Sequence, residues 1–172
     1  MDASLRRKYV LNAIKKQQKP VSASLLAKEL NVSRQLIVGD VALLRAQGNE
    51  IIATARGYMI PNFNETDQYL GKIVCQHTPE DTKDELYTFV DLNALVVNVI
   101  VEHGFYGEIT GCLNLANRKE VDNFMEKVKS AEIKLLSELT MGVHIHTIAC
   151  RNKAHFDKVY QAVADKGYLY KN

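Results

Sequence analysis

The chain has 172 residues, of which 47% are hydrophobic, and its formal net charge at pH 7 is +2. This length allows one domain or two small ones with a substantial core. No run approaches the roughly 20 apolar residues of a membrane-spanning helix, and the charged start MDASLRRKYV lacks the apolar core of a signal peptide. We therefore expect a globular cytoplasmic protein, whose three cysteines fit reduced, buried thiols better than disulfides.

The charge is distributed unevenly along the chain. Residues 1–62 contain ten Lys or Arg against four Asp or Glu, a balance of +6, whereas residues 63–172 contain twelve against sixteen, a balance of −4. A small basic module is the electrostatic footprint expected of a domain that binds nucleic acid. The sequence therefore predicts two domains, 1–62 and 69–172, separated by the polar linker PNFNETDQ.

The first sixty residues predict three helices and a hairpin. Apolar residues recur at helical spacing over residues 4–17, Pro20 follows the end of that helix, and Ser22 and Ser33 are expected to cap two further short helices. The segment IIATARGYMI then predicts two strands that turn at residues 55–57. This order is typical of a winged helix-turn-helix. The residues expected to face its core are Leu5, Tyr9, Leu11, Ile14, Leu25, Leu26, Leu30, Val32, Ile37, Val41 and Leu44.

In a helix-turn-helix, the N-terminal end of the second paired helix enters the DNA major groove. Arg and Gln can form paired hydrogen bonds with guanine and adenine, Ser suits a phosphate, and an Arg on the hairpin can reach the minor groove. The predicted DNA-binding residues are Ser33, Arg34, Gln35, Val38 and Arg56. A protein-interaction module has the same pattern and stays open as an alternative. Gly39 either allows close approach to the DNA backbone or has no role.

The remaining residues predict strands that alternate with amphipathic helices. The strand-like segments are LGKIVCQH, ALVVNVIVEH, EITGCLNL, GVHIHTIAC and a short final YLY, and GFYG joins the second to the third. Helices are expected from about Pro79, over residues 119–130 and over residues 153–166, with Gly167 closing the last. The pattern indicates an α+β domain with a mainly antiparallel sheet and helices on one face.

Two of the five histidines stand one residue apart in GVHIHTIAC. Side chains alternate along a strand, so His144 and His146 share a face, and the apolar residues between them predict that the opposite face packs under the helices. His77 at an earlier strand end and Glu85 in the following helix offer a third nitrogen and a carboxylate oxygen. This donor set suits a borderline divalent ion such as zinc, nickel or iron. From spacing alone, hydrogen-bonded sheet residues are the commoner alternative.

Three segments carry a family resemblance. SRQLIVGDVALLRAQGNEIIATARGYMI resembles the winged helix shared with biotin-operon repressors. VIVEHGFYGEITG and LSELTMGVHIHTIAC resemble signature segments of the three-histidine domain of niacin-responsive transcriptional repressors, the NiaR family. The resemblance covers essentially the whole chain in the same domain order. It implies a repressor, not an enzyme, that binds operator DNA and responds to nicotinic acid in controlling NAD-precursor biosynthesis or niacin-uptake genes. We further predict a homodimer, whose recognition helices would lie about 34 Å apart, one turn of DNA.

The resemblance also implies the fold and the metal ligands of the second domain. That domain would be an open-faced α+β sandwich similar to HPr-like proteins. It would hold a divalent transition metal, with open coordination positions for nicotinic acid as the co-repressor. The ligands that map onto this sequence are His77, Glu85, His144 and His146.

The turn VEHGFYGE is expected to form the wall of the co-repressor pocket through His103, Tyr106 and Glu108. Gly104 departs from the family pattern, in which proline is common at this place. A metal-sensing repressor, with the ion alone as effector, is the alternative function. An enzyme that activates metal-bound water is disfavoured, because the sequence has no nucleophile motif, phosphate loop or zinc-protease helix.

Overall fold

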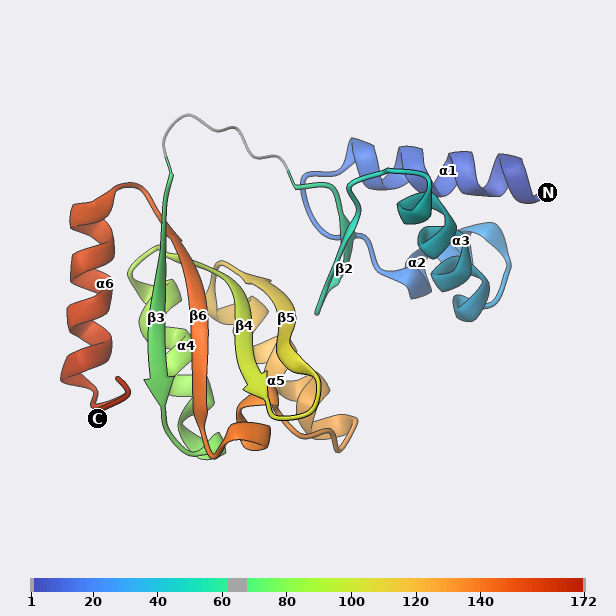
Figure 1. Cartoon of the computed structure of the whole chain (residues 1–172). Helices are drawn as coiled ribbons and strands as arrows, with labels where there is room; N and C mark the ends of the chain where they lie inside the picture. Colours follow the sequence, from blue (N-terminus) through green and yellow to red (C-terminus); the bar gives the residue numbers. More distant parts are fainter. Residues whose placement is uncertain (1, 62–67, 172) are drawn as a thin grey trace. The chain divides into compact units, whose positions relative to one another are not determined.

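The computed structural model describes residues 2–61 and 68–171 and divides the chain into two compact units, Met1–Phe63 and Asn64–Asn172 (Figure 1). Most of the predicted linker, residues 62–67, lies outside the described residues. Within the described ranges, no helix is long and apolar enough to cross a membrane.

The N-terminal unit is a winged helix-turn-helix. Its elements are α1 (Ala3–Lys16), α2 (Ala23–Leu30) and α3 (Arg34–Ala46), followed by the antiparallel wing strands β1 (Ile52–Thr54) and β2 (Gly57–Met59). The hydroxyls of Ser22 and Ser33 accept hydrogen bonds from the backbone N–H groups of Leu25 and Leu36, each at 3.1 Å. Both predicted N-caps are therefore confirmed. Asn31 adopts a left-handed conformation and makes the tight turn between α2 and α3.

The core of this unit differs from the prediction in α1 and α2. Val10 and Ile14 are the buried residues of α1, and Leu26 is fully buried in α2. Ile14 and Leu26 are buried as predicted, whereas Val10 is buried in place of Tyr9, because the buried side chains of α1 must meet α3. The residues of α3 that are buried as predicted are Ile37, Val41 and Leu44. The predicted core residues that are instead exposed are Leu5, Tyr9 and Leu25.

A buried ion pair joins α1 to α3. Asp40 of α3 is 3% exposed, and its carboxylate accepts hydrogen bonds from Arg6 Nε at 2.5 Å and Arg6 Nη2 at 3.2 Å. Arg7 Nη1 lies 3.8 Å from the same carboxylate. Two of the basic residues of this unit therefore hold α1 against the predicted DNA-reading helix.

The wing is attached to the residues before α2. The backbone N–H and C=O groups of Val21 and Tyr58 exchange two hydrogen bonds of 2.8 Å. Gly57 has φ +137°, and a Cβ at this position would lie 2.4 Å from the Val21 oxygen. Only glycine allows the two backbones to approach so closely.

The C-terminal unit is a four-stranded antiparallel sheet in the order β3–β6–β4–β5. Figure 1 shows α4 and α5 behind one face, whereas the other face is open. This is the α+β architecture expected from the sequence, with the 3-10 helix η2 as an element that was not predicted. The elements are β3 (Tyr69–Gln76), η1 (Pro79–Asp81), α4 (Thr82–Asp91), β4 (Leu95–His103), β5 (Gly107–Leu115), α5 (Arg118–Ser130), η2 (Leu136–Thr140), β6 (Val143–Cys150) and α6 (Lys153–Asp165).

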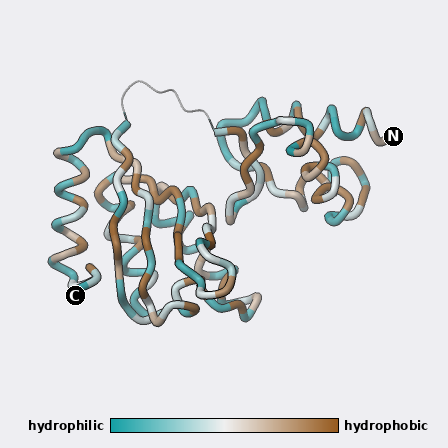
Figure 2. The backbone as a smooth tube through the Cα atoms, viewed as in Figure 1, coloured by the Kyte–Doolittle hydropathy of each residue, from teal (hydrophilic) through white to brown (hydrophobic). Residues whose placement is uncertain are grey.

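Figure 2 shows hydrophobic stretches along the strands. The burial pattern of β3 shows that its hydrophobic side chains lie on both faces of the sheet. In β3, Ile73 and Cys75 are fully buried on the helix side, whereas Leu70 and Val74 alternate with them and are exposed. The sheet therefore has a closed face with a dry core and an open face that is still partly apolar.

The strand β6 corrects one predicted face. His144 and His146 are buried on the side of α4, and Val143 and Ile145 are only half-buried on the open face. The alternation was predicted correctly, but the assignment of the helix-covered face was wrong. The physical reason is that a buried carboxylate of α4, from Glu85, binds both imidazoles.

The end of the chain forms a short edge segment beside β3. Gln76 N–H donates to the Tyr168 carbonyl at 2.8 Å, and Tyr170 N–H donates to the Val74 carbonyl at 3.0 Å. Gly167, with φ +79°, follows the last turn of α6 as predicted. The C-terminal segment thereby reaches the end of β3, next to His77.

Candidate metal centre and DNA-binding surface

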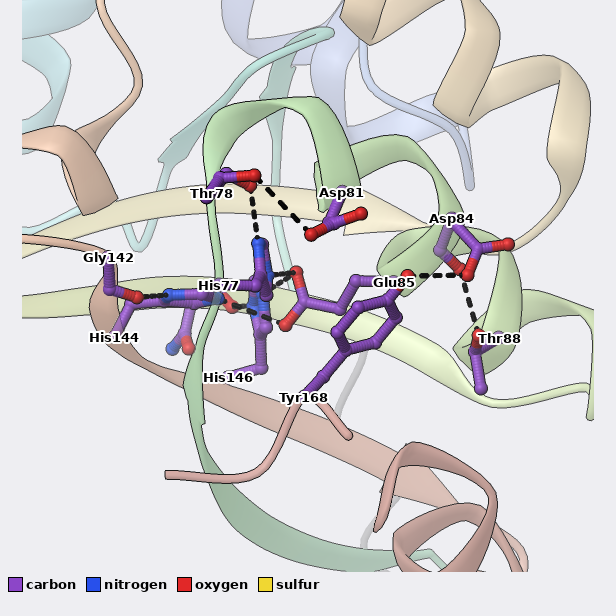
Figure 3. A network of polar contacts seen from close by, with 11 residues as sticks. His77, Thr78, Asp81, Asp84, Glu85, Thr88, Gly142, His144, His146 and Tyr168 are labelled. Carbon is purple, nitrogen blue, oxygen red and sulfur yellow. Dashed lines mark hydrogen bonds and ion pairs between the residues drawn. The ribbon is translucent and has the colours of Figure 1, made fainter. Parts of the chain in front are cut away.

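The four predicted metal ligands lie close together between the sheet and α4, the helix that carries Glu85 (Figure 3). Their side chains are at most 4% exposed, and the Glu85 carboxylate lies among the three imidazoles. The Nε2 atoms of His77 and His146 lie 2.7 Å and 3.4 Å from Oε2, and that of His144 lies 3.0 Å from Oε1. Residues chosen from spacing in the sequence are thus neighbours in space.

Each of the three imidazoles is oriented by a second hydrogen bond. Every Nδ1 atom lies 2.7–2.8 Å from a backbone carbonyl oxygen, which can only accept, so Nδ1 carries the proton. In a neutral ring the Nε2 lone pair is then directed at the centre, which is how proteins usually orient histidines that bind metals. The carbonyls belong to Thr78 for His77, to Gly142 for His144 and to Asn98 for His146.

A β-bulge in β4 makes the third of these carbonyls available. The register of β4 shifts between Val96 and Asn98 against both neighbouring strands. The Asn98 side chain accepts a hydrogen bond from Thr147 N–H at 3.1 Å, so the Asn98 carbonyl can accept the one from His146. Bulges are often found beside functional sites, because they redirect backbone groups in this way.

This arrangement requires positive charge at its centre. Each of the three Nε2 lone pairs lies 2.7–3.4 Å from a Glu85 oxygen and is repelled by the carboxylate unless a proton or a metal ion lies between them. His77 Nε2 is buried and makes no hydrogen bond of acceptable geometry. Metal–ligand bonds of about 2.1 Å place neighbouring donor atoms about 3.0–3.4 Å apart. The donor types and their spacing therefore fit a divalent transition metal ion.

The electrostatics of the ligands agree with a cation site. Burial alone would raise the pKa of Glu85, but the three surrounding imidazoles hold that pKa well below its ordinary value. Burial lowers the pKa of His77, whereas the close contact with the negative Glu85 carboxylate and the Thr78 carbonyl raise it, and the net pKa is raised. Glu85 is therefore a buried anion, and a buried anion needs a compensating positive charge.

The C-terminal segment supports His77. The Tyr168 ring meets the His77 ring edge-on, with centroids 5.2 Å apart, and its hydroxyl donates to Asp84 Oδ2 at 2.7 Å. Lys166 Nζ also donates to the Asp84 carboxylate, at 2.9 Å and 3.0 Å. Because Asp84 precedes Glu85 on α4, these contacts connect two of the ligands. The sequence analysis missed Tyr168, since no local signal places it beside His77.

Cys75 is a second residue whose location the sequence did not reveal. Its thiol is buried beside the centre, and burial raises its pKa, which Glu85 raises further. The sequence predicted only that the cysteines are buried, reduced thiols; Cys75 and Cys150 are buried, Cys112 is half-buried, and all three are free.

A cavity of about 480 Å³ opens beside the centre. This volume lies within the usual range for small-molecule sites, about 300–1,000 Å³. Met141 lines the cavity and is 90% exposed, so its flexible side chain gives the cavity an apolar wall. The lining residues are Gln76, His77, Thr78, Pro79, Glu138, Met141 and Gly142.

The residues predicted to bind the co-repressor lie on the β4–β5 hairpin. His103 Nδ1 accepts hydrogen bonds from the backbone N–H groups of Phe105 and Tyr106, both at 3.2 Å, and the His103 and Tyr106 rings are 5.2 Å apart. Glu108 pairs with Glu102, and strand alternation places both on the open face. None of the three predicted residues lines the cavity beside His77.

The predicted DNA-binding residues lie on α3 and the wing. Ser33, Arg34 and Gln35 are exposed at the start of α3, where a reading helix meets bases, whereas Val38 is half-buried and packs against the core. Arg56 lies in the turn between β1 and β2. Gly39 is exposed on α3, and a Cβ there would meet no atom within 4 Å.

The chain combines two features of a class of transcription regulators. One is a helix-turn-helix whose recognition helix has an exposed N-terminal end, and the other is a second unit with a buried cluster of metal-ligand side chains. Comparison with known proteins agrees: a model of the HTH domain matches residues 6–59, and a model of the 3H domain matches residues 71–172. The chain belongs to the NiaR/NadR family of 3H-domain transcription repressors.

Two relatives cover almost the whole chain. The transcription repressor NadR of Bacillus subtilis (strain 168) is 38% identical over 169 residues, which are 97% of this chain and 94% of the relative. The probable transcription repressor NiaR of Thermotoga maritima is 37% identical over 164 residues, 95% of this chain and 93% of the relative. A family of transcription repressors agrees with the expectation that the chain is not an enzyme.

Proposed function

We propose that this chain represses transcription by binding operator DNA together with nicotinic acid, and that a divalent transition metal ion helps to bind the co-repressor. The observation that carries the proposal is the buried centre, in which three imidazoles with fixed tautomers direct Nε2 at one carboxylate. His77, Glu85, His144 and His146 would hold the ion. The ion would supply coordination positions for a pyridine nitrogen or a carboxylate, the two donors of nicotinic acid.

The cavity beside His77 supports a small ligand next to the ion. It adjoins one ligand directly and also includes Gly142, whose carbonyl orients His144. The cavity provides apolar contact through Pro79 and Met141 and hydrogen-bonding groups through Gln76 and Thr78. This mixture suits an aromatic ring that carries one polar group.

The DNA-binding part of the proposal places Arg34 and Gln35 against base edges and Arg56 against a phosphate or the minor groove. We propose a homodimer, because repressors of this class bind two half-sites with recognition helices about 34 Å apart. Nicotinic acid promotes repression only if it binds the DNA-competent arrangement more tightly than the alternative one.

Two titrations of DNA binding test the proposal. In the first, nicotinic acid is added at saturating metal; in the second, metal is added at saturating nicotinic acid. Enhancement in both supports the proposal. A response to metal with none to nicotinic acid would instead identify a metal-sensing repressor, and no response to either would overturn both functions.

Two variants show whether the effect passes through the centre. His144→Ala removes a ligand and should abolish the response while the winged helix stays folded. His155→Ala removes a buried imidazole outside the centre, which contacts the Leu92 carbonyl, and should retain the response. Paired spin labels on α3 test the geometric mechanism: an unchanged distance with and without nicotinic acid would refute a change in helix spacing.

A further inference from the structure

The residue Cys75 lies beside the centre and has no role in the function proposed above. It is directly opposite His144 in the β3–β6 ladder, with its side chain fully buried on the same face of the sheet. Its Sγ, a ring nitrogen of His144 and a carboxylate oxygen of Glu85 all lie within 4.8 Å of one another. Three donor atoms so close together can bind one ion.

We propose that Cys75 supplies a thiolate ligand to the metal ion, in addition to the three histidines and Glu85. This inference rests on the proposed metal centre and specifies its chemistry. On binding, a metal–sulfur bond forms, and the thiol proton is released to solvent.

The charge of the centre supports a second anionic ligand. Neutral imidazoles add no charge, so a divalent ion with Glu85 alone leaves a net positive charge beneath α4, where the ligands are almost completely buried. A thiolate from Cys75 makes the whole centre neutral. A neutral centre avoids the large desolvation cost of an isolated buried charge.

The buried nitrogen of His77 is an independent indication of an ion at this point. His77 Nε2 is enclosed by protein and lies 2.7 Å from Glu85 Oε2, but the geometry is not that of a hydrogen bond. Cys75 and His77 are two residues apart at the end of β3, as His144 and His146 are on β6. The two strands therefore present two donors each to the space below Glu85.

A thiolate changes which ions the centre prefers. Sulfur is a soft donor, so a centre with Cys75 as ligand favours zinc, cobalt or nickel over magnesium, calcium and manganese, which prefer oxygen ligands. The proposal therefore predicts a sulfur-to-metal signal that a centre of nitrogen and oxygen ligands alone cannot give.

The test is the absorption spectrum of the full-length protein loaded with Co²⁺ under anaerobic conditions with a thiol-free reductant. The visible bands of Co²⁺ report binding, and an intense near-ultraviolet sulfur-to-cobalt charge-transfer band reports the thiolate. We expect both in the wild-type protein. In Cys75→Ser the visible bands should persist and the charge-transfer band should disappear, with Co²⁺ affinity at least about tenfold lower.

Cys150→Ser is the matched control, because Cys150 is a free, buried cysteine on the same face of β6 but at its opposite end, paired with Tyr69. It should keep both spectral features. Visible bands without a charge-transfer band in the wild-type protein would overturn the assignment of Cys75 and leave the metal centre intact. Failure to bind Co²⁺ at all would overturn the centre as well. Absence of the band in the wild-type protein overturns the assignment whether or not a variant folds. When the band is present, its loss in Cys75→Ser and its retention in Cys150→Ser assign it to Cys75, whereas its retention in Cys75→Ser would overturn the assignment.

Discussion

Gly142 allows the start of β6 to approach the backbone of His77. Its replacement by alanine tests whether this close approach positions His77 in the proposed metal centre. Gly142 has φ +86°, a conformation that costs an L-residue roughly 1–2 kcal/mol. The added Cβ would also lie 2.4 Å from the His77 oxygen, whereas ordinary contacts begin near 3.4 Å. The His77 backbone must therefore withdraw by about 1 Å, which moves one ligand away from Glu85.

We expect Gly142→Ala to lower metal affinity about 10–100-fold, the range typical of losing a group that orients a ligand. Competition with a chromophoric chelator measures the affinity, and circular dichroism verifies the fold. Gly107→Ala is the control: Gly107 also has positive φ, +73°, but a Cβ there meets no atom within 4 Å. It should bind metal like the wild type. A folded Gly142→Ala protein with unchanged metal affinity would refute the reasoning.

Three further predictions concern the ion pair, the C-terminal segment and DNA binding. Asp40→Ala leaves the Arg6 guanidinium without its partner and should lower the melting temperature of the N-terminal unit. Glu29→Ala removes only an exposed hydrogen bond with Tyr9 and should leave the melting temperature unchanged, so equal melting curves for the two variants would contradict the prediction. Tyr168→Phe keeps the ring against His77 and should bind metal almost normally, while Tyr168→Ala should lose about tenfold in chelator competition. Arg34→Ala should weaken operator binding by about 1–3 kcal/mol but hardly affect non-specific DNA, and an equal loss on both would exclude base recognition.

The local signals in the sequence were sufficient for most of the helices and strands. Ser22 and Ser33 cap α2 and α3 because capping depends on neighbours three residues away. The burial of Val10 in place of Tyr9 in α1 was not predictable, since both residues can face a core and only the position of α3 selects between them. The 3-10 helix η2 was missed because it is short and has little periodicity of its own.

The candidate ligands could be chosen from the sequence, but their surroundings could not. An alternating strand shows which residues share a face and not which face the helices cover, so His144 and His146 were placed on the wrong side. The hydrogen bond from His146 to Asn98 depends on a bulge in another strand. The contact of Tyr168 with His77 depends on a pairing between positions far apart in the chain. Such contacts arise only when the sheet is assembled.

The proposed ligands are widely separated in the sequence, which would link metal binding to the lifetime of the protein. Glu85 and His144 are 59 positions apart, so an ion shared between them would act as a reversible cross-link. Closing a loop of that length costs an unfolded chain about 4 kcal/mol of entropy in the chain-entropy model. At free metal 100 times the Kd, binding would stabilise the folded unit by about 2.7 kcal/mol. If the proposed centre holds an ion, a cell that lacks the ion would have more unfolded protein exposed to proteolysis, and the amount of the protein would then depend on metal supply.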